Sequence, residues 1–266
     1  MRPRTFLITL SALLAVMVAM YGLLFLPESV YSELIDEERP VESIGALALL
    51  ASSIFCFLAF RKTPPARERA GKVRKLVLLV LAGVFLIGFG EEISWGQRLL
   101  GVDTPAEIKS ASGQGELNFH NLNALHGWLD ADRLFQLFWF GFGVLVPLAV
   151  ALYAPARRTL GRYLPVVPLV VATALIANQL LHDVAKVLFE GRYANSQFPL
   201  AHSLFETKET LVALSFAVAA FLLYRQARTE SEEAAQWTGR EEPSPSLAGS
   251  HAPEAEREPK PAHSSV

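Results

Sequence analysis

Six apolar runs, each close to the length of a membrane-crossing helix, constrain the fold of this chain more than any other feature. A bilayer core about 30 Å thick needs about 20 apolar residues in helical conformation. The third and sixth runs reach that length only when the polar residues at their ends are included. The runs are Thr5–Leu26, Ser43–Phe60, Leu76–Gly90, Leu134–Tyr153, Tyr163–Leu181 and Leu211–Tyr224. We therefore predict an all-α, polytopic membrane helix bundle with about six transmembrane spans.

The composition agrees with a membrane protein and disfavours other classes. Of the 266 residues, 52% are hydrophobic and only 19% are charged, and the mean hydropathy is +0.31, whereas soluble domains carry roughly 25% charge. The net charge of −2 gives no reason to expect a nucleic-acid partner. The only cysteine, Cys56, cannot form a disulfide within the chain and is expected to be a small buried hydrophobe.

The distribution of Lys and Arg predicts the topology. Basic residues gather in the second and fourth connections and near both termini, whereas the first, third and fifth connections contain few of them. Because cytoplasmic loops are enriched in Lys and Arg, both termini are predicted to be cytoplasmic. The first run is too long for the core of a signal peptide, so we expect a retained helix. A bacterial plasma (inner) membrane is the expected location.

The chain is predicted to have two parts, a six-span transmembrane domain at 1–228 and a disordered cytoplasmic tail at 229–266. The tail is rich in Glu, Pro, Ala and Ser and has almost no large apolar residues, so it cannot bury enough surface to offset chain entropy. Pro147, inside the fourth run, is expected to kink its helix or to be accommodated by neighbouring helices.

Polar residues enter three of the predicted spans at a similar depth. Glu91, Asn178 and Glu209 each lie 16 residues from a basic residue at the cytoplasmic end of their span, which corresponds to about 24 Å of helix. A charge facing lipid costs about 2.5–3.5 kcal/mol at mid-bilayer and somewhat less near the interface. These groups should therefore face one another, or a wet cavity, below the outer surface.

The third span ends in the segment Glu91-Glu92-Ile93-Ser94-Trp95-Gly96-Gln97-Arg98. Carboxylates at a helix C-terminus oppose the macrodipole and need a compensating cation or proton. In a continuous helix, Glu91 and Arg98 would share a face. The segment is either an interfacial cap, with Trp95 and Arg98 at the headgroups, or a paired-carboxylate site for a metal or a proton.

The remaining candidates lie in the third connection and at the outer ends of the last two spans. His120 and Asn121 belong to a stretch dense in Asn and His, which is either a packed outer loop or part of a site. Asn178 and His182 share a helix face, and Asp183 could orient an imidazole or act as a base; the alternative is hydrogen bonding between helices.

The start of the sixth span carries a stripe of metal-ligand types. His202, Glu206 and Glu209 fall at i, i+4 and i+7 on one face, and such nitrogen and oxygen ligands suit a divalent metal. The alternative is structural: Ser203 and Glu206 form a capping box and the glutamates pair with Lys208.

Two resemblances follow from these motifs. The segment from Glu91 to Arg98, followed by Asn118-Phe119-His120-Asn121, resembles a recurring E-E-x-S-W-G-Q-R…N-x-H-N signature of bacterial multi-pass membrane proteins of unassigned function. The chain also bears a faint similarity to alkaline-ceramidase-like membrane hydrolases, which hold zinc between their spans. That similarity implies roles for Ser94, His182, Asp183 and His202, but that family has seven spans and its motif spacing is not reproduced here.

The leading hypothesis is an outward-facing metal-dependent hydrolase of a lipid or lipid-linked substrate. In this hypothesis His182 and His202, with His120 as a further candidate, bind a divalent metal, most readily zinc, and Glu206 and Glu209 complete the ligand set. Glu91 or Glu92 acts as general base on metal-bound water, and Asp183 is a further catalytic candidate. A proton- or cation-coupled transporter or channel and a non-catalytic scaffold are the alternatives.

Overall fold

The computed structural model of the chain describes residues 3–35, 40–64, 68–101, 103–106, 131–189 and 200–238. Within these ranges there is no β-strand, and six helical segments are long and apolar enough to cross a membrane. The predicted all-α polytopic bundle is thereby confirmed, and the chain is a multi-pass membrane protein. His120 and Asn121 lie outside the described residues.

The membrane-crossing segments are α1, α3, α4, the continuous run from α7 to α8, α11 and α13, and shorter helices join them. The bounds are α1 Pro3–Leu23, α2 Glu28–Ile35, α3 Pro40–Lys62, α4 Arg69–Glu92, the 3-10 turn η1 Ser94–Gly96, α5 Gln97–Leu100, α7 Ala131–Phe140, the π-helical turn η3 Gly141–Leu145, α8 Val146–Leu152, α9 Ala154–Arg158, α10 Leu160–Tyr163, α11 Leu169–Leu188 and α13 Leu200–Thr238.

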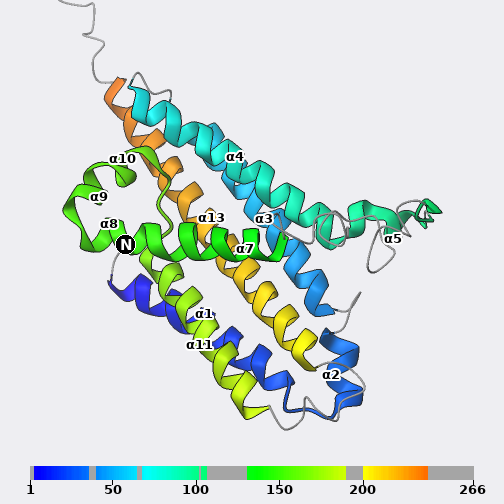
Figure 1. Cartoon of the computed structure of the whole chain (residues 1–266). Coiled ribbons are helices and arrows are strands. Elements are labelled where there is room, and N and C mark those ends of the chain that lie inside the picture. Colours follow the sequence, from blue (N-terminus) through cyan, green and yellow to red (C-terminus); the bar gives the residue numbers. More distant parts are fainter. Residues whose placement is uncertain are drawn as a thin grey trace, which may run out of the picture.

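Helix α13 occupies the centre of the bundle (Figure 1). It packs along α3 on one side and along α11 on the other, while α4 packs on α3 and α1 packs on α11. Gly45 allows the close approach of α3 and α13, because a Cβ atom there would lie 3.0 Å from Oγ1 of Thr210. That hydroxyl donates to the carbonyl of Val41 at 3.2 Å. Small residues and interhelical hydrogen bonds of this kind drive helix association in lipid.

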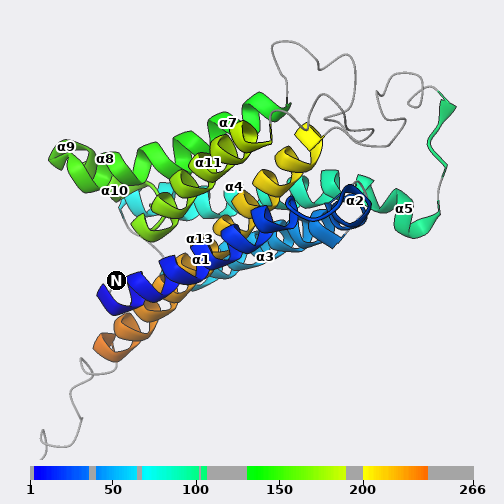
Figure 2. The same cartoon turned by 90° about the horizontal axis from the view of Figure 1, so that it is seen from below.

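The bundle has two chemically different ends. The start of α1 and the end of α13 lie together with α9 and α10 at one end, here called the terminal end (Figure 2). Ion pairs connect Arg74 with Glu230, at 3.8 Å, and Arg162 with Glu68 at this end. The opposite, distal end contains the end of α4 and the beginning of α13. The basic residues thus gather as the topology requires, and which end faces the cytoplasm remains a prediction.

Pro147 is accommodated by a change in helix type. The π-helical turn η3 immediately precedes it, and α8 continues with Pro147 in its first turn. A proline has no N–H and its ring crowds the carbonyl four residues earlier, here that of Gly143, so the wider π turn relieves that contact. The kink predicted as one outcome therefore takes the form of a π turn inside a continuous span.

Two predicted boundaries differ from the structure. The fifth span begins at Leu169 rather than near Tyr163, because Pro165 and Pro168 keep the preceding segment out of the helix and Pro168 takes the capping position.

The sixth helix extends to Thr238, so residues 229–238, which were predicted to belong to the disordered tail, continue α13. Pairs at i and i+4 stabilise this extension: Gln226 donates to Glu230 at 2.8 Å and Arg228 to Glu232 at 2.7 Å. The rest of the predicted tail lies outside the described residues.

Candidate functional site

The end of α4 turns back on itself through residues with left-handed backbone. Ser94, Trp95 and Gly96 have φ angles of 46°, 55° and 78°, and two consecutive non-glycine residues in this region store strain of about 1–2 kcal/mol each. Helix α4 ends at Glu92 and α5 begins at Gln97. The expectation that Glu91 and Arg98 share a helix face is therefore wrong.

Two contacts between Trp95 and α4 stabilise this turn. Its Nε1 donates to Oε1 of Glu91 at 2.6 Å. Its ring lies against Gly90, where an added Cβ atom would come within 2.9 Å of Cζ3. The turn therefore orients the Glu91 carboxylate, and strain of this kind gathers at functional sites.

Carboxylates from three helices meet at the distal end. Glu92 on α4 lies close enough to Glu91, to Glu42 on α3 and to Glu206 on α13 for their charges to interact. On α13, Nε2 of His202 is 3.7 Å from Oε1 of Glu206. Mutual repulsion opposes the simultaneous ionisation of all these carboxyl groups. We call Glu42, Glu91, Glu92, His202 and Glu206 the acidic cluster.

Ser203 does not cap the N-terminus of helix α13. The helix begins at Leu200, so Ser203 lies within it, is 2% exposed, and its carbonyl accepts a hydrogen bond from the hydroxyl of Thr207 at 2.7 Å. The capping-box alternative for Glu206 therefore does not apply, and the role of His202 and Glu206 in a site stays a prediction.

Asn178 connects three helices by hydrogen bonds. Its Oδ1 accepts from the Tyr21 hydroxyl of α1 at 3.0 Å, and its Nδ2 donates to the carbonyl of Lys208 on α13 at 3.0 Å. Asn178 is only 1% exposed. The structural alternative, hydrogen bonding between helices, thus accounts for this residue.

His182 and Asp183 lie one turn beyond Asn178 on α11. His182 is close to the backbone of Leu204 and to the charge of Lys208, and its buried Nδ1 has no hydrogen-bond partner of normal geometry among the described residues. Asp183 accepts a hydrogen bond from Nε2 of Gln179 at 2.9 Å.

Lys208 is a buried cation beside aromatic rings. It is 7% exposed, and its Nζ lies 5.7 Å from the ring centroids of both Trp139 and Phe205. The charges of Asp183 and Glu209 act on it, although no carboxylate of the described residues comes within 4 Å of its Nζ. Cation–π contacts thus replace the direct ion pair that was predicted between Lys208 and the glutamates.

Packed aromatic rings lie on the terminal side of the acidic cluster. The centroids of Phe85 on α4 and Phe216 on α13 are 5.3 Å apart, and Phe138 on α7 lies 5.9 Å from the first and 5.3 Å from the second. We call these three rings the aromatic layer. It belongs to the hydrophobic core that the central helices share, and the acidic cluster lies on its distal side.

The structure brings together some of the predicted site residues and separates others. Glu91, Glu92, His202 and Glu206 share the acidic cluster, whereas Asn178, His182, Asp183 and Lys208 line the contact of α11 with α13. Ser94 is buried. The charge of Glu209 acts on Lys208, and the side chain of Arg98 lies outside the described part of the structure.

Within the described ranges, no three His, Cys, Asp or Glu residues lie close enough together to hold a metal ion. The predicted zinc site therefore stays a prediction that would need a ligand such as His120.

Sequence reasoning missed Glu42 and Trp139. Glu42 could have been found, because it is an acidic residue immediately before the second apolar run, at the outer end of that span. Trp139 gives no such signal, since it lies among other aromatic residues in an apolar run. Comparison with protein-family models, curated proteins and solved structures gives no match, so no known relative assigns a role to these residues.

Proposed function

We propose that the protein is a membrane-embedded hydrolase that acts at the distal end of the bundle on a lipid or lipid-linked substrate. The observation that carries the proposal is the acidic cluster, in which the charges of Glu42, Glu91 and Glu206 act on Glu92 and His202 lies beside Glu206. Placing an ionisable group within a membrane costs free energy, and such groups commonly mark functional sites. A cluster of carboxylates that cannot all be charged together supplies a proton donor and a proton acceptor in one place.

Glu92 and Glu206 are the proposed acid–base pair. The ionised carboxylate takes a proton from water as the water oxygen bonds to the carbonyl or phosphoryl centre of the substrate. The protonated carboxyl gives its proton to the leaving oxygen, or to the leaving nitrogen of an amide, as the scissile bond breaks. His202, 3.7 Å from Glu206, passes the proton between that carboxylate and solvent. Glu91 is held by Trp95 and is a positioning residue for its neighbour Glu92.

A transporter or channel is less well supported. A conduit needs polar groups along the whole depth of the membrane, and the aromatic layer fills the space on the terminal side of the acidic cluster. A scaffold role explains the hydrogen bonds of Asn178, but it does not explain why carboxylates of like charge lie close together. The predicted divalent metal is a separate hypothesis, and the proposed acid–base pair does not depend on it.

The test is hydrolysis of a panel of long-chain esters, amides and phosphodiesters by the purified protein in proteoliposomes, with products followed by mass spectrometry. Glu92→Gln and Glu206→Gln should each lower the rate by about 100-fold or more, since general acid–base groups contribute at least that much. The matched control is Glu232→Gln, because Glu232 is an exposed residue that pairs with Arg228 at the terminal end.

Hydrolysis that is equally fast in Glu92→Gln and in the wild type would rule out the proposed acid–base pair. If both variants only lower thermal stability and none of the panel is turned over, the scaffold hypothesis is the better one.

A further inference from the structure

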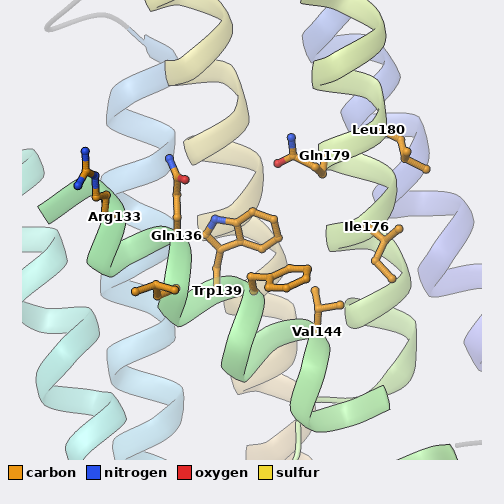
Figure 3. A pocket seen from close by; sticks show the side chains of 9 residues that line it. Arg133, Gln136, Trp139, Val144, Ile176, Gln179 and Leu180 are labelled. Carbon is orange, nitrogen blue, oxygen red and sulfur yellow. The ribbon is translucent and has the colours of Figure 1, made fainter. Parts of the chain in front are cut away.

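A cleft of about 530 Å³ lies between α7 and α11, separate from the acidic cluster. Arg133, Gln136 and Gln179 lie at its distal part, and apolar side chains including Leu137, Ile176 and Leu180 form its walls (Figure 3). Its volume is within the range of about 300–1,000 Å³ found for small-molecule sites. The cleft thus carries its polar side chains in its distal part, where Leu180 also lies, and only apolar side chains toward the middle of the bundle.

The apolar walls of the cleft face the surroundings of the bundle. Leu137 is 69% exposed and Leu180 is 60% exposed, and both belong to membrane-crossing segments. A molecule in the cleft would therefore enter from the bilayer. Arg133 and Gln136 lie within two helical turns of the start of α7, and Gln179 lies nine residues before the end of α11.

Trp139 provides an independent indication that the cleft takes a ligand. It lines the cleft and is 6% exposed, yet its buried Nε1 has no hydrogen-bond partner in the described part of the chain. Figure 3 shows this nitrogen on the side of Gln136. A buried indole N–H normally finds an acceptor, and a ligand oxygen at the polar part of the cleft would provide one.

We propose that the cleft binds one glycerophospholipid, with an acyl chain along Leu137, Ile176 and Leu180 and the phosphate at Arg133. A guanidinium binds phosphate oxygens in a bidentate manner, and the amides of Gln136 and Gln179 can donate to the ester and phosphate oxygens. Asp183 accepts one N–H of the Gln179 amide at 2.9 Å, so the second N–H of that amide is the one that would donate to the ligand. The occupant does not depend on whether the acidic cluster is catalytic.

The test uses the full chain in maltoside micelles and follows quenching of tryptophan fluorescence by added lipids with brominated acyl chains. The signal of Trp139 is the difference between the wild type and Trp139→Phe. Brominated phosphatidylglycerol should quench it at a concentration at least tenfold lower than brominated diacylglycerol, which has the same chains and no phosphate. Equal quenching by the two lipids would overturn the phosphate assignment.

Two pairs of variants locate the site. Arg133→Gln should abolish the preference for the phospholipid, whereas Arg158→Gln, which changes an exposed arginine at the terminal end, should retain it.

Ile176→Phe should narrow the cleft and weaken quenching by both lipids at least tenfold. Val184→Phe, on the same helix at a position that is 55% exposed, should not weaken it. If Arg133→Gln keeps the preference or Ile176→Phe binds as the wild type does, the proposal is wrong. Unchanged binding in Glu92→Gln would separate this site from the proposed hydrolase.

Discussion

At the scale of single residues, the distal half of the bundle combines two kinds of polar group. Asn178 is satisfied by its neighbours and holds helices together. Glu92 and Glu206 instead lie among like charges, an arrangement that does not favour folding. Asn178 therefore has a structural role, whereas Glu92 and Glu206 carry the proposed chemistry.

Replacing Asn178 by Leu should destabilise the bundle without a direct effect on chemistry. The variant loses hydrogen bonds to Tyr21 and to the Lys208 carbonyl, and we expect the free energy of unfolding to fall by about 1–2 kcal/mol. Thr173→Val is the control, since the Thr173 hydroxyl bonds only within its own helix. Unfolding by denaturing detergent measures both, and equal stability of the two variants would contradict the role given to Asn178.

Gly90→Ala tests the contact that orients Glu91. The new Cβ atom would lie 2.9 Å from Cζ3 of Trp95, so the ring must move and its hydrogen bond to Glu91 must lengthen or break. We expect altered near-ultraviolet circular dichroism and a loss of about 1–3 kcal/mol of stability relative to the control. Gly83→Ala is that control, because no atom lies within 4 Å of its added Cβ. An unchanged spectrum in Gly90→Ala would show that Trp95 is not held in this position.

The residues that sequence reasoning found were those whose charge is out of place in an apolar segment. Glu91, Glu92 and Glu206 stand out for this reason, and the cost of charge in lipid predicts that they turn inward. Which partners they meet could not be predicted, because the rotation of each helix depends on packing with its neighbours. The position of Glu42 at the outer end of a span is visible in the sequence, but its proximity to Glu92 is not.

At the scale of helices, apolar length predicted the existence of the spans better than their ends. Charged residues extend α4 back to Arg69 and α13 forward to Thr238, because Lys, Arg and Glu are good helix formers outside the apolar core. The short helix α2 was not predicted, although Tyr31 and Ile35 bury their side chains against the bundle. The left-handed turn after α4 was also missed, since Ser94 and Trp95 carry no sequence signal for positive φ.

The π turn η3 offers a matched pair of glycine variants. A Cβ atom on Gly143 would lie 2.7 Å from Cδ1 of Leu175 and 3.2 Å from Cζ of Phe216, whereas nothing lies within 4 Å of one on Gly141. We expect Gly143→Ala to lower stability by about 1–3 kcal/mol through overpacking, and Gly141→Ala to be neutral or slightly stabilising. Thermal unfolding in detergent measures both, and the reverse order would refute the packing of α7–α8 on α11.

At the scale of the whole molecule, the two ends of the bundle differ in charge and in chemistry. Basic residues and their ion pairs gather at the terminal end, and the acidic cluster lies at the other. Such an arrangement suits a protein that meets its substrate from one side of the membrane and is anchored by positive charge on the other.

Cysteine labelling in intact bacterial cells expressing the protein tests this sidedness. In a Cys56→Ala background, Leu100→Cys at the distal end should react with a membrane-impermeant maleimide added outside. Arg158→Cys at the terminal end should react only after the membrane is permeabilised. The opposite pattern would invert the topology predicted from the basic residues, while leaving the bundle itself intact.

The central claim is that acids of α4 and α13 form one site at the distal end, and chemical cross-linking tests it most directly. In the Cys56→Ala background, the pair Glu92→Cys and Glu206→Cys should be joined within one chain by a short bis-maleimide, as detected by mass spectrometry of the linked peptides. The pair Glu92→Cys and Glu230→Cys should not be, because 24 residues of α13, about 36 Å of helix, separate the second positions. Failure of the first pair to cross-link, or equal cross-linking of both, would contradict the account.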